Sequence, residues 1–328
     1  MAIGVYSTFK VYEPEFQTGM VEGLNQNVAL FNEGTRGAIR LIPRALNGHY
    51  SKEAFFEDVA SLVTRRDIGN VSTIADIDLT QDEVISVKIN RKVGPVAKTL
   101  DSMRKAGLSE ADASRAFGKL AATRKLKDMV NTAIIGLEAA IEGNTAMNLD
   151  ITSESTKTAS VYALNRTLAK FGDAAGDIVF FLFHSKVLFD VTNGQITGGV
   201  SGIADLVSFN GAQQSILGRG WAMTDCPALT DANGSATDTY NTLGLVSGAC
   251  EVTESEPDVF ATDSITDKEN LAVRWRSEHA FNVKVKGFKW NTTGGGVNPS
   301  DSTLGTTSNW TQVAYDDKLT AGVRLDSQ

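Results

Sequence analysis

Residues 109–142 read SEADASRAFGKLAATRKLKDMVNTAIIGLEAAIE, and this stretch decides the fold. Its apolar side chains recur at the three- and four-residue spacing of an α-helix: Phe117, Leu120, Leu126, Val130, Ile134, Leu137 and Ile141. Ser109 is a favourable N-cap, and Gly143 with Asn144 ends the pattern. At about 1.5 Å per residue the helix is on the order of 50 Å long, about three times the average. Because strand patterns lie on both sides of it, we predict a helix that backs a mixed β-sheet.

The composition is that of an ordinary globular protein, with 328 residues, 42% hydrophobic and 21% charged. No apolar run is long enough for a membrane span, and residues 1–10 lack the apolar segment of a secretory signal. Cys226 and Cys250 are the only cysteines, which favours a reducing compartment. The net charge of −8 argues against a surface that grips nucleic-acid phosphates, but allows a container whose inner wall faces DNA.

Residues 1–70 contain two segments with too few apolar residues to form a core of their own. Residues 1–36 have little periodicity and predict an extended arm. Residues 37–42 alternate and stop at Pro43, and residues 59–64 offer a return strand. We therefore predict an exposed hairpin over residues 37–70, and a hairpin of this kind is best explained if it lies on a neighbouring molecule.

The rest of the chain alternates strand and helix patterns. Residues 84–90 predict a strand that breaks at Gly94–Pro95, and residues 158–171 predict a second helix. Residues 178–183 are continuously apolar, as in a strand covered on both faces, and Ser185 is expected to cap the helix that follows.

The last part of the chain also predicts strands. Residues 271–290 alternate, with a parity change at Gly287 that predicts a bulge. Apolar residues between 310 and 325 predict a last element that returns to the sheet.

The sequence contains no pattern of an enzyme or metal site. It lacks the glycine-rich phosphate motifs and the GxSxG nucleophile elbow. The three histidines, His49, His184 and His279, are not spaced as metal ligands, and the cysteines form no CxxC pair. His184 precedes Ser185, but we interpret the pair as the end of a strand beside a helix cap. We predict no catalytic residue, no cofactor and no metal.

Charged residues gather in two stretches. The acidic stretch fits no EF-hand spacing and is interpreted as a solvated face; it comprises Glu251, Glu254, Glu256, Asp258, Asp263, Asp267 and Glu269. The basic cluster of the long helix comprises Lys119, Arg124, Lys125 and Lys127. Since Arg124 and Lys127 share one helical face, we predict a subunit or inner-surface contact, with a plain solvated face as the alternative. The candidate interface residues outside the helix are Arg40, Arg44 and Lys52.

Three stretches carry a family resemblance. They are DIVFFLFHSKVLFDV (177–191), GRGWAMTDCPAL (218–229) and SNWTQVAYDDKLTAGVRL (308–325). Together with the order of elements, they resemble the major capsid protein of tailed bacteriophages, which has the Hong Kong 97-like fold.

The resemblance implies an α+β fold with named parts. These are an N-terminal arm (1–36), an E-loop (37–70), a peripheral (P) domain (71–150 and 271–328) with the spine helix 109–142, and an axial (A) domain (151–270). It also implies that hexamers and pentamers of the chain close into an icosahedral shell around double-stranded DNA, without a membrane.

The resemblance further implies partners and a location. Because Met1 lies almost directly at the arm, we expect a separate scaffolding protein, and we also expect a portal protein. The chain would assemble in the bacterial host cytoplasm and end in the virion capsid. The alternatives are an encapsulin-like nanocompartment and, from another class, a hydrolase or carbohydrate-binding protein with a site in the loops of 192–270.

Overall fold

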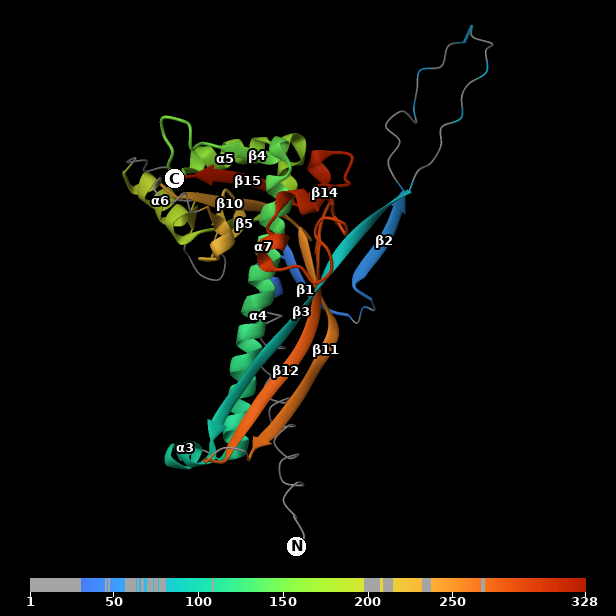
Figure 1. Ribbon diagram of the computed structural model, residues 1–328. Helices are drawn as coiled ribbons and strands as arrows, with labels where there is room; N and C mark the ends of the chain where they lie inside the picture. The colour runs from blue at the N-terminus through green and yellow to red at the C-terminus, as the bar shows by residue number, and fades with distance from the viewer. Residues whose placement is uncertain are drawn as a thin grey trace.

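A long helix joins two β-sheets in the computed structural model (Figure 1). The structure describes residues 31–44, 46, 48–56, 63, 65, 68–69, 73, 76, 81–107, 109–197, 207–208, 215–231, 237–266 and 269–328. Helix α4 (Glu110–Glu142) begins after Ser109, whose Oγ accepts a hydrogen bond from the Asp112 N–H at 3.1 Å. Gly143 is its C-cap. The helix predicted over 109–142 is therefore confirmed at both ends.

The first sheet has five strands and lies along α4. Its order is β1 (Ile39–Pro43), β11 (Cys250–Ile265), β12 (Ala272–Val285), β3 (Gln81–Thr99) and β2 (Tyr50–Phe56). Only the β1–β11 pair is parallel, so the sheet is mixed, as predicted. Alternate residues such as Val87, Ile89 and Phe281 face the core that α4 covers. Gly136 lets the helix approach its neighbours closely. An added Cβ would lie 3.2 Å from the ring of Trp310, which is outside this sheet, and 3.5 Å from Val283 of β12.

Strand β3 continues through Gly94–Pro95, where the sequence analysis placed a break. The pairing with β12 shifts register between Trp275 and Ser277, so Gly94 and Pro95 have no ladder partner. A proline at this point removes no ladder hydrogen bond, because the bulge leaves its nitrogen unpaired in any case. Gly94 has φ +84, and an added Cβ would lie 2.8 Å from the Trp275 carbonyl oxygen.

The prediction of a hairpin over residues 37–70 is wrong for its first strand, which does not pair with the strand that follows it. Strands β1 and β2 lie at opposite edges of the five-stranded sheet, so the chain between them crosses the face turned away from α4. The Leu46 N–H donates to the Ser255 carbonyl at 3.0 Å, and Lys88 Nζ donates to the Leu46 carbonyl at 3.1 Å. This crossover buries Ser86 and Lys88 to 4% exposure each. Strand β2 pairs with β3 instead, and the return strand predicted at 59–64 falls, apart from Val63, outside the described residues.

The second sheet has eight strands and lies at the C-terminal end of α4 (Figure 1). Its path runs β4 (Asn148–Asp150), β15 (Gly322–Ser327), β10 (Thr239–Val246), β5 (Ile178–Phe183), β8 (Arg219–Met223), β7 (Ser215–Ile216) and β6 (Val207–Ser208), and β9 (Thr230–Asp231) pairs with β10. Helices α5 (Val161–Ala169) and α6 (Ser185–Thr197) belong to the same region. The apolar strand predicted at 178–183 is confirmed, and Phe180, Phe181 and Phe183 are fully buried.

Two strands belong to a different sheet from the one expected. Strand β11 falls in the range predicted for the A-domain, yet it pairs with β12 and β1 of the first sheet. Strand β15 falls in the range predicted for the P-domain, yet it pairs with β10 and β4 of the second. The expected domain bounds came from the family resemblance, and periodicity along a strand identifies its buried face but not its partner, so it could not correct either placement.

Short elements complete the fold. They are α3 (Leu100–Lys105), α7 (Asp301–Leu304), β13 (Phe288–Trp290), β14 (Trp310–Gln312) and the 3₁₀ turns η1 (Thr145–Met147), η2 (Gly172–Asp177), η3 (Pro227–Leu229), η4 (Thr307–Asn309) and η5 (Asp317–Leu319). The bulge predicted at Gly287 is a turn with φ +81 that ends β12 and starts β13. No helix of the described ranges is long and apolar enough to span a membrane.

Candidate assembly surface

The basic cluster predicted on α4 divides between solvent and interior. Lys119, Arg124 and Lys127 are exposed, whereas the Lys125 side chain is 0% exposed. Lys125 points at the sheet, where its Nζ lies 2.7 Å from Asp258 Oδ2 and also contacts Glu254. The prediction that Lys125 faces another subunit is therefore wrong. The error arose because small residues, Ala121 and Ala122, set the buried face in this half of α4, while Leu120 is 55% exposed.

Lys125 is part of a buried polar cluster between α4 and the sheet. His279 on β12 is 5% exposed, and its Nδ1 lies 3.7 Å from Asp258 Oδ1. Burial, followed by the nearby charges of Lys125 and Arg91, lowers the pKa of His279 to about 3, so the imidazole is neutral at pH 7. Burial raises the pKa of Asp258, against the opposing effect of Lys125. The acidic stretch is therefore not simply a solvated face, because part of it neutralises a buried lysine.

Arg91 extends the same cluster along β3. Its Nε lies 3.0 Å from Asp128 Oδ2 of α4, and its Nη2 lies 2.5 Å from Asp301 Oδ1 of α7. Burial raises the pKa of Asp128, and Arg91 opposes that shift. Arg91 therefore holds three elements together, and the sequence analysis did not single it out. A basic residue in the apolar alternation of β3, between Ile89 and Val93, was the available signal.

The other predicted interface residues are exposed but already engaged within the chain. Arg40 Nη2 donates to Ser247 Oγ at 3.0 Å. Lys52 Nζ lies 2.7 Å from Glu83 Oε1, which links β2 to β3. Arg44 is exposed where the crossover begins, and its N–H donates to the Glu254 carbonyl. Exposed pairs of this kind contribute roughly 0–1 kcal/mol, so these side chains remain open to a neighbouring subunit at little cost.

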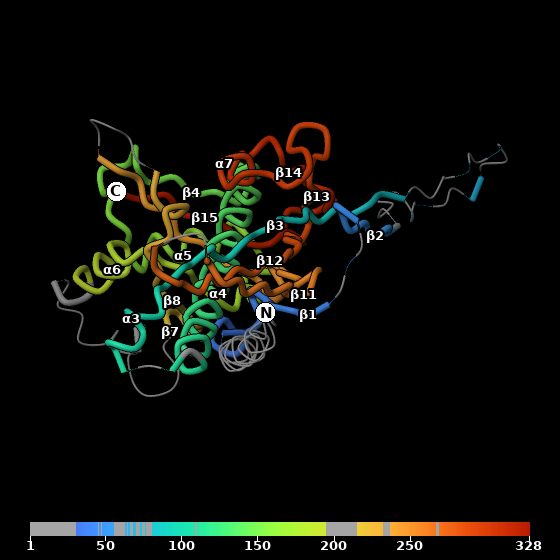
Figure 2. Tube along the Cα trace, turned by 60° about the horizontal axis from the view of Figure 1, so that its bottom comes forward, coloured from blue at the N-terminus to red at the C-terminus, as the bar shows by residue number. Residues whose placement is uncertain are grey.

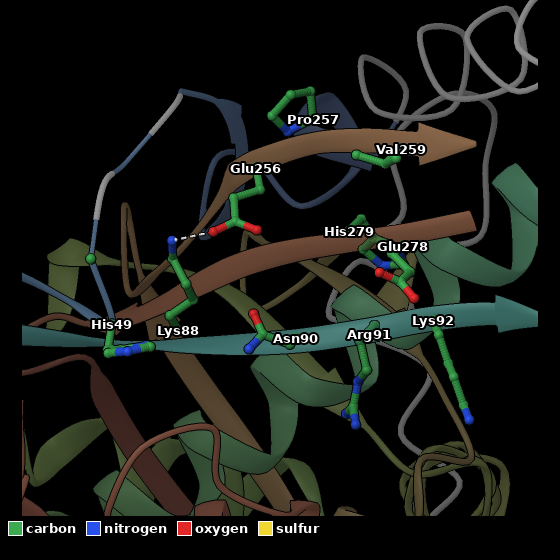
Figure 3. A pocket seen from close by; sticks show the side chains of 11 residues that line it. His49, Lys88, Asn90, Arg91, Lys92, Glu256, Pro257, Val259, Glu278 and His279 are labelled. Carbon is green, nitrogen blue, oxygen red and sulfur yellow. Dashed lines mark hydrogen bonds and ion pairs between the residues drawn. The ribbon is translucent and has the colours of Figure 1, made fainter. Parts of the chain in front are cut away.

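A groove of about 870 Å³ lies beneath the crossover on the sheet face turned away from α4 (Figure 3). Its lining includes His49, Lys88, Asn90, Lys92, Glu256 and Glu278. Figure 3 shows Lys88 and Glu256 pointing toward one another, and their Nζ and Oε1 atoms are 2.9 Å apart. Within the described part of the chain, no three His, Cys, Asp or Glu side chains are grouped to hold a metal ion. The groove therefore offers a lining of mixed charge.

Two of the stretches that carry the family resemblance meet at the ends of β5 and β8. Asp225 Oδ1 accepts a hydrogen bond from the Ser185 N–H at 3.3 Å, and His184 Nδ1 accepts one from the Lys186 N–H at 3.2 Å. Hydrogen bonds from Ser185 lower the pKa of Asp225. The prediction that Ser185 caps α6 is wrong, because His184 and Asp225 do so. This capping engages His184 Nδ1 and gives His184 a structural role at the start of α6.

The third stretch, residues 308–325, packs against the second half of α4. Trp310 Nε1 donates to the Leu304 carbonyl at 2.9 Å, and its ring meets Trp290 edge-on at 5.1 Å. Asp317 Oδ1 accepts hydrogen bonds from Asn144 Nδ2 at 3.0 Å and Gln312 Nε2 at 2.9 Å. These contacts fix the C-terminal segment against the end of the helix.

Arg324 on β15 organises a second buried cluster that sequence analysis missed. Its side chain is 4% exposed and lies 2.7 Å from Glu138 of α4 and 2.6 Å from Asp326. Asp231 and Glu142 lie 3.2 and 3.3 Å away. Burial raises the pKa of Glu138 to about 8, even though Arg324 opposes the shift. The available signal was a glutamate on the apolar stripe of the helix, between Ile134 and Ile141.

The fold is that of bacteriophage capsid proteins. The capsid of Ralstonia phage GP4 aligns with a TM-score of 0.51 and 11% identity, covering 88% of this chain and 87% of that chain. A chain from Mycobacterium phage Bobi aligns with a TM-score of 0.50 and 16% identity, covering 87% of each. At these identities the likeness establishes the fold class, and it confirms the predicted α+β phage capsid architecture across most of the chain.

The family model described as Gp13-like, major capsid protein 13-like, matches residues 8–324. The chain therefore belongs to the Gp13-like major capsid protein family. No curated protein sequence matches it. The prediction of a phage capsid protein is confirmed, and the location of the chain is the virion capsid. The family is one of structural shell proteins, and it does not favour the nanocompartment or hydrolase alternatives.

Proposed function

We propose that hexamers and pentamers of this chain close into an icosahedral shell around double-stranded DNA. The observation that carries the proposal is the β2–β3 ribbon. In Figures 1 and 2 β2 lies at the margin of the molecule, away from α4 and from the second sheet. Lys52, Glu53 and Ala54 of β2 are exposed. Strand β2 is an edge strand that pairs only with β3 among the described residues, so its outer side can be stabilised by contact with another copy.

The parts of the shell subunit follow from the two sheets. We assign the P-domain to the five-stranded sheet with α4, and the A-domain to the eight-stranded sheet. We assign the E-loop to the β2–β3 ribbon, in which Tyr50–Phe56 pairs with Gln81–Val87, in place of the predicted 37–70. The predicted arm (1–36) extends too far at its end, because Phe31 packs on the main core and Thr35 is 5% exposed.

Charge favours α4 as the surface that receives the ribbon of a neighbour. Residues 57–80, which connect β2 to β3, contain five acidic and two basic residues, a net charge of −3. Arg124 and Lys127 are exposed on α4. Opposite charges on two surfaces that repeat in every subunit steer assembly and set its register.

The remaining partners belong to the same proposal. The net charge of −8 supports a wall that does not hold DNA by attraction, so the genome would be packed by a motor at a portal protein. A separate scaffolding protein would guide assembly in the cytoplasm of the bacterial host.

Electron microscopy of the purified full chain tests the shell, which requires closed icosahedral particles. Mass spectrometry and nuclease treatment of the contents then separate a DNA container from a nanocompartment filled with enzymes.

A variant in which Asn-Gly replaces residues 57–80 keeps the β2–β3 pairing but removes its connection. We expect folded subunits that do not close shells. Deletion of residues 1–30 is expected to act in the same way. Shells of normal size and stability from both variants would contradict the role given to the ribbon and the arm, and the absence of closed particles from the parent chain would contradict the shell.

A further inference from the structure

Lys125 holds its amine in a closed site between α4 and β11. Its side chain is 0% exposed, and its Nζ lies 2.7 Å from Asp258 Oδ2 and also contacts the Glu254 carboxylate. The side chains of Asp258 and Glu254 are 11% and 28% exposed. A primary amine is therefore held against two carboxyl groups in a place that little water reaches.

The second oxygen of the Asp258 carboxylate is not used by the fold. Oδ1 accepts no hydrogen bond from the described part of the chain, and it faces His279, whose Nδ1 lies 3.7 Å away and whose side chain is 2% exposed. A buried carboxylate with a purely structural role normally has partners for its oxygens. Burial raises the pKa of Asp258, against the opposing effect of Lys125, which favours the neutral acid that can react with an amine.

We propose that Lys125 and Asp258 condense into an amide bond that joins α4 covalently to β11, with Glu254 moving the proton. The proton that Lys125 shares with Asp258 passes to the carboxylate, which leaves a neutral amine and a carboxylic acid. Nζ then attacks Cγ of Asp258, and Glu254 takes a proton from the nitrogen. Glu254 returns that proton to a carboxyl oxygen, the C–O bond breaks, and the oxygen leaves as water. The ammonium and carboxylate together contain every atom of the amide and the water, so no further reactant is needed.

Three features of the site favour this bond. The reacting groups are already in contact, which replaces a collision in solution by a step within one site. A neutral amide also removes a buried ammonium and a buried carboxylate, both of which are costly to hold away from water. Glu254 contacts the reacting nitrogen and can act as general acid and base.

The bond would fasten the part of α4 that has the fewest apolar contacts. Ile134, Leu137 and Ile141 of the second half lie in the main core, whereas Ala121 and Ala122 of the first half belong to a small satellite cluster. A covalent link between residues 133 positions apart also restricts the unfolded chain, as a disulfide does. The first half of the helix would then stay on the five-stranded sheet when weaker contacts open.

Mass spectrometry of the purified full-length chain tests the bond, after incubation under native conditions at neutral pH. The intact mass should be lower than that of the sequence by one water molecule. Trypsin should no longer cleave after Lys125, and the digest should contain a branched peptide in which residues 125–127 are joined to residues 220–268. Fragmentation should place the junction at Asp258. A full intact mass without the branched peptide would overturn the proposal, as would a junction at Glu254.

Two variants and a control test the roles of the residues. Lys125→Arg keeps the positive charge but removes the amine, so this variant should keep its full mass. Lys127→Arg, on the exposed face of α4, is the matched control and should lose water as the parent does. Glu254→Gln keeps both reacting groups and should slow the reaction by about 100-fold or more. Loss of water from Lys125→Arg, or an unchanged rate in Glu254→Gln, would overturn the mechanism. The branched peptide of the parent decides the question even if a variant does not fold.

Discussion

Arg324 Nη1 of the last strand lies 2.7 Å from Glu138 Oε1 in the second half of α4. This pair joins the helix to the eight-stranded sheet, as Lys125 joins it to the five-stranded sheet 13 positions earlier. Asn241 Nδ2 donates to Asp231 Oδ2 at 3.0 Å in the same cluster. One helix is therefore tied to both sheets by buried ionisable groups, and these contacts affect how the subunit responds to pH and mutation.

Glu138 should make the subunit less stable as the pH rises. Its pKa in the folded protein, about 8, exceeds the ordinary value of 4.5, so its contribution is fully present below about pH 4.5 and is lost as the pH rises through 8. The free energy of unfolding should fall by at most about 1.4 kcal/mol per pH unit from this group. Glu138→Gln should flatten that dependence in urea unfolding measured from about pH 5 to 8. Identical slopes for parent and variant would contradict the assignment.

Lys125 should be far more important to folding than its exposed neighbours. Lys125→Met keeps much of the side-chain volume but leaves Asp258 and Glu254 without their cation, and breaking a buried pair costs about 3–5 kcal/mol. Lys127→Met, on the exposed face, should change the free energy of unfolding by less than about 0.5 kcal/mol. Denaturant midpoints of the two variants measure the difference. Equal midpoints would show that Lys125 contributes no more than a surface residue.

Arg124 and Lys127 should affect assembly rather than folding. Arg124→Glu combined with Lys127→Glu should shift the product toward free capsomers as salt is lowered, because new repulsion is least screened there. Thermal unfolding of the unassembled chain should barely change, since both side chains are exposed. Shell yield across a salt series, beside the parent, is the measurement. Equal yields at every salt concentration would show that these residues form only a solvated face.

Truncation of Phe181 should be among the most destabilising substitutions in the second sheet. Its side chain is fully buried and its ring lies 5.7 Å from that of Phe183. Phe181→Ala should lower the free energy of unfolding by about 3–5 kcal/mol, measured by denaturant titration. His184→Ala should also destabilise, because it removes the acceptor for the Lys186 N–H. A hydrolytic activity of the chain that disappears with His184→Ala would contradict the structural role given to this residue.

The sequence by itself determined the elements whose signals are local. The bounds of α4 followed from Ser109, Gly143 and the apolar repeat, because capping and periodicity act within a few residues. The buried strand at Ile178–Phe183 followed in the same way, from a run that only a covered strand tolerates. Family resemblance added the shell architecture through motifs that meet in space at His184 and Asp225.

Only the tertiary structure decided what depends on partners distant in sequence. It placed β1 and β2 at opposite edges of one sheet, and β11 and β15 in different sheets from those expected. It also turned Lys125 inward between exposed Arg124 and Lys127, because close packing of Ala121 and Ala122 determines which side of α4 meets the sheet. A helical repeat shows which residues share a face. The repeat does not show which charged side chain is buried. That depends on carboxylates distant in sequence, here Glu254 and Asp258 of β11, which neutralise Lys125.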